Sequence, residues 1–186
     1  MKRITLYLLC LLLTLPCVAS DNYQQAVKIT FLSWITGSTK VSYEHVLPHR
    51  QTAEICGSLI GAGYDKFGNR PTGFTLRYAH KFFIGDRYDG GLAGLYLRPE
   101  AIYSHYDYDA RHTALRTPAR MSTLLATAGY QITRGHLIVD AWAGAGPAFG
   151  TPADTGYHHG FALFNLFGMQ SDHIVLSFSI RLGYCF

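Results

Sequence analysis

Histidine and carboxylate side chains that lie close together are the first candidates for chemistry in this chain. Nine histidines are present, and His158 and His159 follow Asp154 and Tyr157 within a few residues. Imidazole and carboxylate groups ligate transition metals, but a site needs three or four of them to converge. No fixed ligand spacing such as His-Glu-x-x-His occurs. We therefore expect solvated loop histidines, with no metal site and no cofactor.

Serine chemistry is the second candidate. A serine hydrolase needs a nucleophile, a histidine and an acidic side chain in hydrogen-bond contact. Small barrel enzymes that act on lipid A would show a histidine two residues before a serine, whereas this chain contains only Ser104-His105. By strand alternation, Ser177 and Ser179 share a face with Arg181 rather than with a base. We predict no catalytic residues, and a lipid A-modifying hydrolase is kept as an alternative.

Charged side chains recur at alternate positions of otherwise apolar segments. In the segment 72–84, for example, Leu76 and Tyr78 lie on one face while Arg77 lies on the other. Four negative and four positive charges follow this alternation, and they predict a paired network inside a closed structure, because buried charges persist only when partnered. The eight residues are Glu44, Glu54, Arg77, Lys81, Arg98, Glu100, Asp140 and Arg181.

The elements that must position these charges are alternating strands. An eight-stranded barrel is just narrow enough for side chains to fill its interior, and in lipid only helices and closed barrels satisfy the backbone. We therefore predict an all-β fold, an eight-stranded antiparallel up-and-down transmembrane β-barrel. A soluble barrel of lipocalin type would turn the charged set outward, and alternation alone allows both. The predicted strands are 27–35, 39–47, 52–64, 72–84, 92–106, 119–132, 136–149 and 173–186.

The two ends of the chain indicate export to the Gram-negative outer membrane. Lys2 and Arg3, an apolar run and a small-residue site ending at Ser20 form a secretory signal peptide of the Sec type. We expect cleavage of residues 1–20 and one barrel domain over residues 21–186. The last strand alternates apolar residues up to Tyr184 and Phe186, and we expect these two to form the signal that the barrel-assembly machinery reads.

Composition agrees with a membrane barrel. Charged residues make up 15% of the chain, below the roughly 25% of soluble domains. The formal net charge is +4 and falls to +2 without Lys2 and Arg3, so no strong field favours nucleic acid as a partner. We expect contact with outer-membrane lipids and lipopolysaccharide instead. Six tyrosines near strand ends predict an interfacial girdle: Tyr43, Tyr78, Tyr96, Tyr103, Tyr106 and Tyr130.

Cysteine chemistry depends on the same prediction of export. Cys10 and Cys17 would leave with the signal peptide, whereas Cys56 and Cys185 remain in an exported protein, where a disulfide is permitted. The two remaining cysteines lie on strands that we do not expect to be neighbours. We interpret them as buried thiols, with a disulfide as the alternative.

Four short motifs resemble a family of small outer-membrane β-barrel proteins with no assigned activity. They are Val41-Ser42-Tyr43-Glu44, the strand 91–100 with Leu95-Tyr96-Leu97-Arg98, Ala128-Gly129-Tyr130-Gln131 and Gly183-Tyr184-Cys185-Phe186. Members of this family look like distant relatives of the OmpA and OmpX barrels. The resemblance covers nearly the whole mature chain. It implies an eight-stranded meander and no established activity.

The apolar segment 160–169 lies in the longest predicted outer loop. It could be a cap over the barrel mouth, an extended hairpin or a docking surface. A ninth barrel strand is disfavoured, because single-chain bacterial barrels close with even strand numbers. Candidate contacts to an unknown surface partner are His158, His159, Phe161, Phe164 and Phe167.

The combined prediction is a non-enzymatic integral outer-membrane protein with a lumen filled by side chains. It would act through the outer loops at 65–71, 107–118 and 150–172, in surface contact or in envelope integrity. Transport of a small apolar molecule and lipid A modification are the alternatives.

Overall fold

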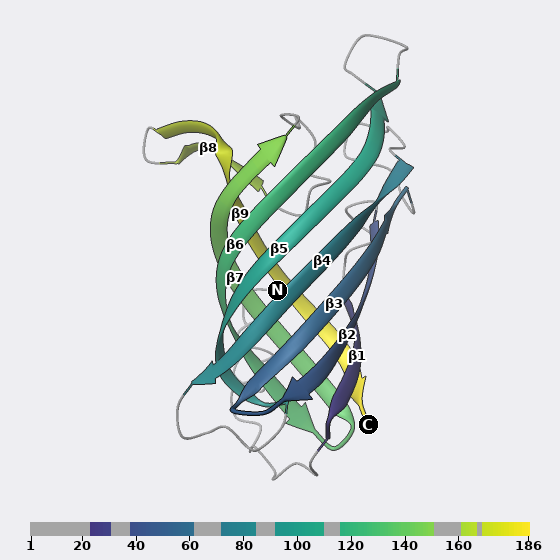
Figure 1. Ribbon diagram of the computed structural model, residues 1–186, viewed down its shortest axis with the longest axis vertical. Helices are drawn as coiled ribbons and strands as arrows, with labels where there is room; N and C mark the ends of the chain where they lie inside the picture. The colour runs from purple at the N-terminus through teal and green to yellow at the C-terminus, as the bar shows by residue number, and fades with distance from the viewer. Residues whose placement is uncertain are drawn as a thin grey trace, which may run out of the picture.

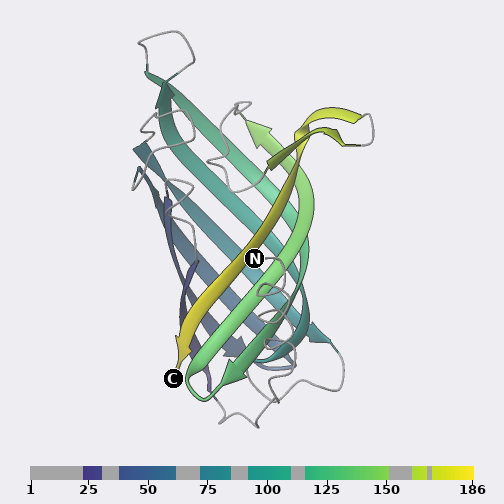
Figure 2. The same ribbon diagram turned by 180° about the vertical axis from the view of Figure 1, so that it is seen from behind.

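The computed structural model describes residues 23–30, 38–61, 72–84, 92–109, 116–150, 161–166 and 169–186. Each strand from β1 to β7 pairs antiparallel with the next, and β9 pairs with both β7 and β1. This pairing closes an eight-stranded up-and-down barrel of tilted strands (Figure 1 and Figure 2), which confirms the predicted fold class. The strands are β1 (Gln25–Thr30), β2 (Ser38–Leu47), β3 (Gln51–Ile60), β4 (Thr72–Ile84), β5 (Gly94–Asp109), β6 (Arg116–Arg134), β7 (Leu137–Gly150), β8 (Phe161–Leu166) and β9 (Met169–Cys185).

Helices play no part in positioning the side chains discussed below. In the ranges given above, no helix is long and apolar enough to cross a membrane.

Alternation along each strand separates an apolar outer face from a polar inner face. In β4, Leu76 is 54% exposed while its neighbours Thr75 and Arg77 are buried. The same pattern recurs in β9, where Ile180 is exposed and Arg181 is buried. Because side chains of a strand point alternately to its two faces, the whole charged set enters the interior. The lipocalin-type arrangement, with charges outward, is therefore excluded for these strands.

The seam between the first and last strands closes the barrel. β1 and β9 pair from Ala26 opposite Cys185 to Thr30 opposite Arg181. Two further backbone hydrogen bonds, of 3.1 and 2.9 Å, join Gln25 and Phe186 beyond the ladder. The two ends of the closing strands therefore lie together at one rim of the barrel.

Tight turns occupy the same rim. His49 and Arg50, between β2 and β3, have φ angles of 63° and 60°, and Gly135, between β6 and β7, has a φ of 53°. Two successive left-handed residues fit the right-handed twist of a hairpin. Turns this short fix the register of the strands they join, and so place the inward-facing side chains of β2, β3, β6 and β7.

A ninth strand is present in the segment 160–169, and it lies outside the barrel wall, where no ninth strand was expected. β8 pairs only with β9, from Phe161 opposite Leu176 to Leu166 opposite Met169, with register irregularities on the way. In Figure 1 this hairpin bends away from the barrel wall at the rim opposite the C-terminus. The even-number rule applies to strands that close the wall, so it does not forbid a strand outside it. Of the three predicted arrangements, the segment adopts the extended hairpin.

Two of the six predicted girdle tyrosines lie inside the barrel instead. Tyr96 and Tyr106 are 0% exposed. Tyr96 is two residues before Arg98 on β5, so strand alternation places it on the inner face with Arg98 and Glu100. The girdle prediction was wrong for Tyr96 because it relied on proximity to a strand end. The other four are exposed on the outer face, as predicted: Tyr43, Tyr78, Tyr103 and Tyr130.

Apolar side chains form layers at both ends of the interior, and the charged residues lie between them. At the rim that holds the C-terminus, the buried cluster is Tyr23, Ala26, Leu92, Ile138 and Cys185. Toward the opposite rim, two small clusters are Ile60 with Tyr106 and Ala119, and Met121 with Ala148 and Val175.

Candidate functional site: a charged cluster inside the barrel

Two lysines and three carboxylates from five strands meet inside the barrel. Lys28 Nζ lies 2.9 Å from Asp140 Oδ2 and 3.2 Å from Glu54 Oε2, and it also contacts Glu44. Lys81 Nζ lies 2.8 Å from Asp140 Oδ2 and 3.1 Å from Glu44 Oε2. All five side chains are fully buried. We call this group the lysine–carboxylate cluster.

Gln131 of β6 completes the hydrogen bonds of the two lysines. Its Oε1 accepts from Lys28 Nζ at 3.1 Å and from Lys81 Nζ at 2.5 Å. Its Nε2 donates to the Leu92 carbonyl at 2.9 Å, and that carbonyl also accepts from the Thr133 hydroxyl at 2.7 Å. The oxygen and the nitrogen of the Gln131 amide both have partners, which fixes the orientation of the amide. Gln131 therefore links the cluster to the backbone before β5.

Tyr96 of β5 covers the cluster from one side. Its hydroxyl donates to Asp140 Oδ1, and Lys81 Nζ lies 4.6 Å from the centroid of its ring. Gly129 is the register partner of Tyr96 on β6. A Cβ at Gly129 would collide with the Tyr96 hydroxyl and with the Ala141 carbonyl, so the absence of a side chain there makes room for the phenol.

A second group, which we call the arginine layer, consists of Arg77, Arg98 and Arg181. Arg98 and Arg181 both donate to the same oxygen, Oε1 of Glu54, with a distance of 2.9 Å for Arg98 Nη2. Glu100 lies between Arg77 and Arg98. Its Oε1 is 2.7 Å from Arg77 Nε, and its Oε2 is 3.1 Å from Arg98 Nη1. Glu54 therefore joins the arginine layer to the lysine–carboxylate cluster.

Trp142 of β7 forms the platform of the arginine layer. The guanidinium carbons of Arg98 and Arg181 lie 4.3 and 4.2 Å from the centroid of its ring, and that of Arg77 lies 5.8 Å away. Cations at this range over an indole face are attracted by the ring quadrupole. The indole and the three guanidinium groups therefore lie together in one layer inside the barrel.

The structure places all eight charged residues predicted from alternation in the interior, and all are at most 5% exposed. Sequence analysis missed Lys28, which contacts three carboxylates, and it left Gln131 unassigned. Lys28 stands between the outward-facing Val27 and Ile29. The same strand alternation would therefore have predicted that Lys28 faces inward.

Metal binding is the alternative chemistry for three carboxylates. Oxygens of Glu44, Glu54 and Asp140 all lie within 4.8 Å of one another. The ammonium groups of Lys28 and Lys81 already lie among them, within ion-pair distance. Because cations satisfy these carboxylates, the geometry favours charge pairing over metal ligation.

The serine and histidine candidates are separated by the barrel wall. Ser104 is buried, with its Oγ 3.1 Å from Thr75 Oγ1, whereas the ring of His105 lies tilted, 5.9 Å from the outward-facing ring of Phe74. A nucleophile and a base on opposite faces cannot share a proton. Ser177 also lies inside.

The candidate partner contacts are not placed by the structure. His158, His159 and Phe167 lie outside the described residues, and so do the side chains of Phe161 and Phe164. Cys56 and Cys185 are both buried free thiols, which confirms that interpretation.

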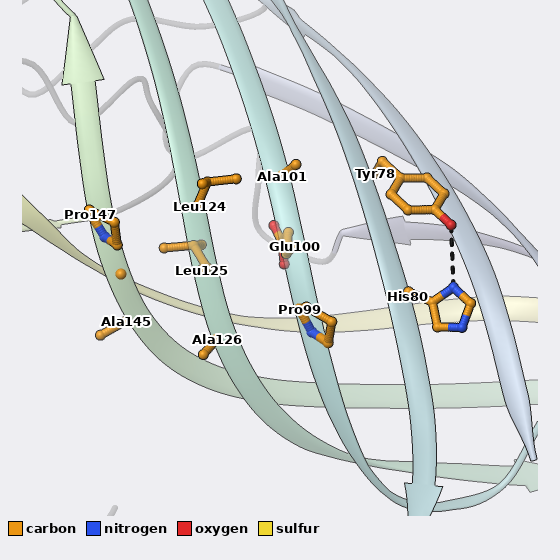
Figure 3. Close-up of a pocket in the computed structure, with 11 residues that line it drawn as sticks. Tyr78, His80, Pro99, Glu100, Ala101, Leu124, Leu125, Ala126, Ala145 and Pro147 are labelled. Atoms are coloured by element: carbon orange, nitrogen blue, oxygen red, sulfur yellow. Dashed lines mark hydrogen bonds between the residues drawn. The ribbon is translucent and has the colours of Figure 1, made fainter.

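A shallow depression of about 500 Å³ crosses the outer face of β4 to β7 (Figure 3). Its floor is made by Ala101, Ala126 and Ala145, next to the ring of Tyr78. On its edge the Tyr78 hydroxyl lies 3.3 Å from His80 Nδ1, and His80 Nε2 lies 2.9 Å from Gln51 Oε1. Both contacts are satisfied when Nε2 carries the hydrogen. No serine, threonine or cysteine is among the residues that line the depression, and its small apolar floor suits hydrocarbon.

Comparison with known proteins rests on structure alone. No family model matches the sequence, and no curated protein matches it. The N-terminal β-barrel domain of Pseudomonas aeruginosa OprF is similar in structure, with a TM-score of 0.54, 10% sequence identity, and coverage of 89% of this chain and 98% of that domain. This chain shares the eight-stranded antiparallel barrel fold of that domain. At this identity the likeness concerns the fold only. It carries no information about the interior residues described above.

Proposed function

We propose that this chain is an integral protein of the Gram-negative outer membrane that does no catalysis and acts through its outer loops, in surface contact or envelope integrity. The observation that carries the proposal is the sidedness of the wall. Apolar side chains such as Leu76 and Ile180 cover the outer face, while the charged side chains are paired inside. A narrow barrel whose lumen is filled by such pairs has no evident path for solutes, which leaves its loops as contact surfaces.

Collision rates of spin labels test the sidedness. Cysteines replacing Leu76 and Thr75 would be labelled one at a time, in a background with Cys56→Ser and Cys185→Ser, and the protein inserted in lipid vesicles. We expect membrane-dissolved oxygen to relax the label at position 76 strongly and the label at position 75 weakly. A label at position 76 that responds mainly to a water-soluble nickel complex would contradict membrane insertion.

Deletion of residues 161–167 tests the role of the outer hairpin. β8 lies outside the closed wall, so the shortened protein should still show the mobility shift between unheated and boiled samples that marks a folded barrel. Adhesion of cells carrying the shortened protein should fall relative to cells carrying the intact chain. Equal adhesion would remove this hairpin from the proposed contact surface.

Two measurements separate the alternatives. A steady current across a planar bilayer would favour transport, and a changed lipid A mass spectrum in cells with the gene would favour an enzyme. The same proposal includes the expected partners, which are outer-membrane lipids, lipopolysaccharide and the barrel-assembly machinery. The assembly machinery would recognise Tyr184 and Phe186.

A further inference from the structure

The interior of the barrel carries more positive than negative charge. Lys40 of β2 also faces inward, because it pairs in register with the buried Ser58. Among the described residues, six cations then face four carboxylates. An uncompensated charge in a closed interior is costly unless a counter-ion accompanies it. The cations are Lys28, Lys40, Arg77, Lys81, Arg98 and Arg181, and the carboxylates are Glu44, Glu54, Glu100 and Asp140.

The surplus lies in one part of the lumen. In the lysine–carboxylate cluster two ammonium groups face three carboxylates, so no positive surplus arises there. Around Trp142 the three guanidinium groups share Glu100 and one oxygen of Glu54. Lys40 has Arg77, Arg181 and the already shared Glu100 among its electrostatic neighbours. The surplus positive charge is therefore concentrated at the arginine layer.

Several hydrogen-bond donors in the same layer have no acceptor among the described residues. They are Arg98 Nε, Arg181 Nε and Nη2, and Trp142 Nε1, all on side chains that are at most 4% exposed. Buried N–H groups in folded proteins almost always have a partner. A water molecule would accept hydrogen bonds from these donors, but it would leave the surplus positive charge uncompensated. An anion would accept the hydrogen bonds and also compensate the charge.

We propose that the arginine layer binds a small inorganic anion of halide size. The donors of Arg98, Arg181 and Trp142 would hold it, and Lys40 would add to the positive potential around it. A compact ion suits this site, because the donors belong to side chains that are at most 4% exposed. This site is independent of the outer loops and of any surface partner.

Fluorescence of Trp142 tests the proposal directly. The chain has two tryptophans, so Trp34→Phe leaves Trp142 as its only tryptophan, and excitation at the red edge of the indole band avoids the tyrosines in the folded protein in detergent micelles. Iodide would replace gluconate at constant ionic strength, because gluconate is too large for the site. We expect saturable quenching by iodide, and competition by chloride that weakens it. Quenching that rises linearly and ignores chloride, or no quenching at all, would overturn the proposal.

A pair of variants tests the electrostatic part. Lys40→Gln removes one charge near the site, and we expect the half-saturating iodide concentration to rise by about threefold or more. Arg134→Gln removes a charge from the exposed last residue of β6 and should leave that concentration unchanged. Equal affinities in the two variants would contradict binding to the arginine layer. The titration of the parent protein decides the main question whether or not Lys40→Gln folds.

Discussion

Lys28 of β1 and Asp140 of β7 form an ion pair of 2.9 Å between Nζ and Oδ2, although 112 positions separate them in the sequence. β9 lies between these two strands and pairs with both. The side chain of Lys28 passes over Gly183 of β9, its register partner, where a Cβ would contact Lys28 Cγ. The pair therefore braces the seam where the first and last strands close the barrel.

Removal of one partner of this pair should destabilise the barrel strongly. Lys28→Met leaves three buried carboxylates with Lys81 as their remaining ammonium partner, and we expect a loss of about 3 to 5 kcal/mol in the free energy of unfolding. Asp140→Asn in the same protein should recover part of that loss, because it removes one of the three negative charges that Lys81 alone then faces among the ammonium groups. The measurement is urea unfolding in detergent or lipid vesicles, followed by the mobility shift of the folded form. Additive effects of the two substitutions would mean that the pair is not coupled.

The contact between Tyr96 and Gly129 gives a second prediction. Gly129→Ala places a methyl group where the Tyr96 hydroxyl and the Ala141 carbonyl already lie, so we expect a loss of about 1 to 3 kcal/mol. Tyr96→Phe keeps the ring and removes only the hydrogen bond to Asp140, with an expected loss of about 2 kcal/mol. Gly57→Ala on β3, where a Cβ meets nothing within 4 Å, is the matched control. A loss at Gly57 as large as at Gly129 would show that any added methyl group is harmful.

Alternation predicts which charges enter the barrel, because the side-chain period of a strand is two and a shift of one residue would turn every side chain over. Glu54 and Arg181 were assigned inward on that ground alone. Their mutual contact was not predictable, because it depends on how far each strand is displaced along its neighbours around the closed wall. Lys28 was missed because β1 is short, with one charged residue between Val27 and Ile29. The extended hairpin that contains β8 was one of three arrangements left open for 160–169, because the even-number rule concerns only strands that close the wall.

The two buried thiols give a third prediction. Cys56 and Cys185 are free and lie on β3 and β9, which are not neighbours in the wall. We expect a maleimide reagent to leave the folded barrel unlabelled at both positions and to label both after unfolding in urea, since burial blocks access. The count of labels is read by mass spectrometry. Electrophoretic mobility of the unfolded chain should be the same with and without reductant, and faster migration without reductant would indicate a disulfide.

The turn between β6 and β7 gives a fourth prediction. Gly135 has a φ of 53°, and a Cβ there would meet no atom within 4 Å. Gly135→Ala therefore changes only the backbone preference, and a left-handed conformation costs an L-residue about 1 to 2 kcal/mol. Gly57 lies within β3 with no such φ, so Gly57→Ala should be neutral or slightly stabilising, because alanine narrows the unfolded ensemble. Comparing the urea midpoints of the two variants isolates the turn, and a midpoint for Gly135→Ala equal to that of Gly57→Ala would contradict a left-handed residue at this position.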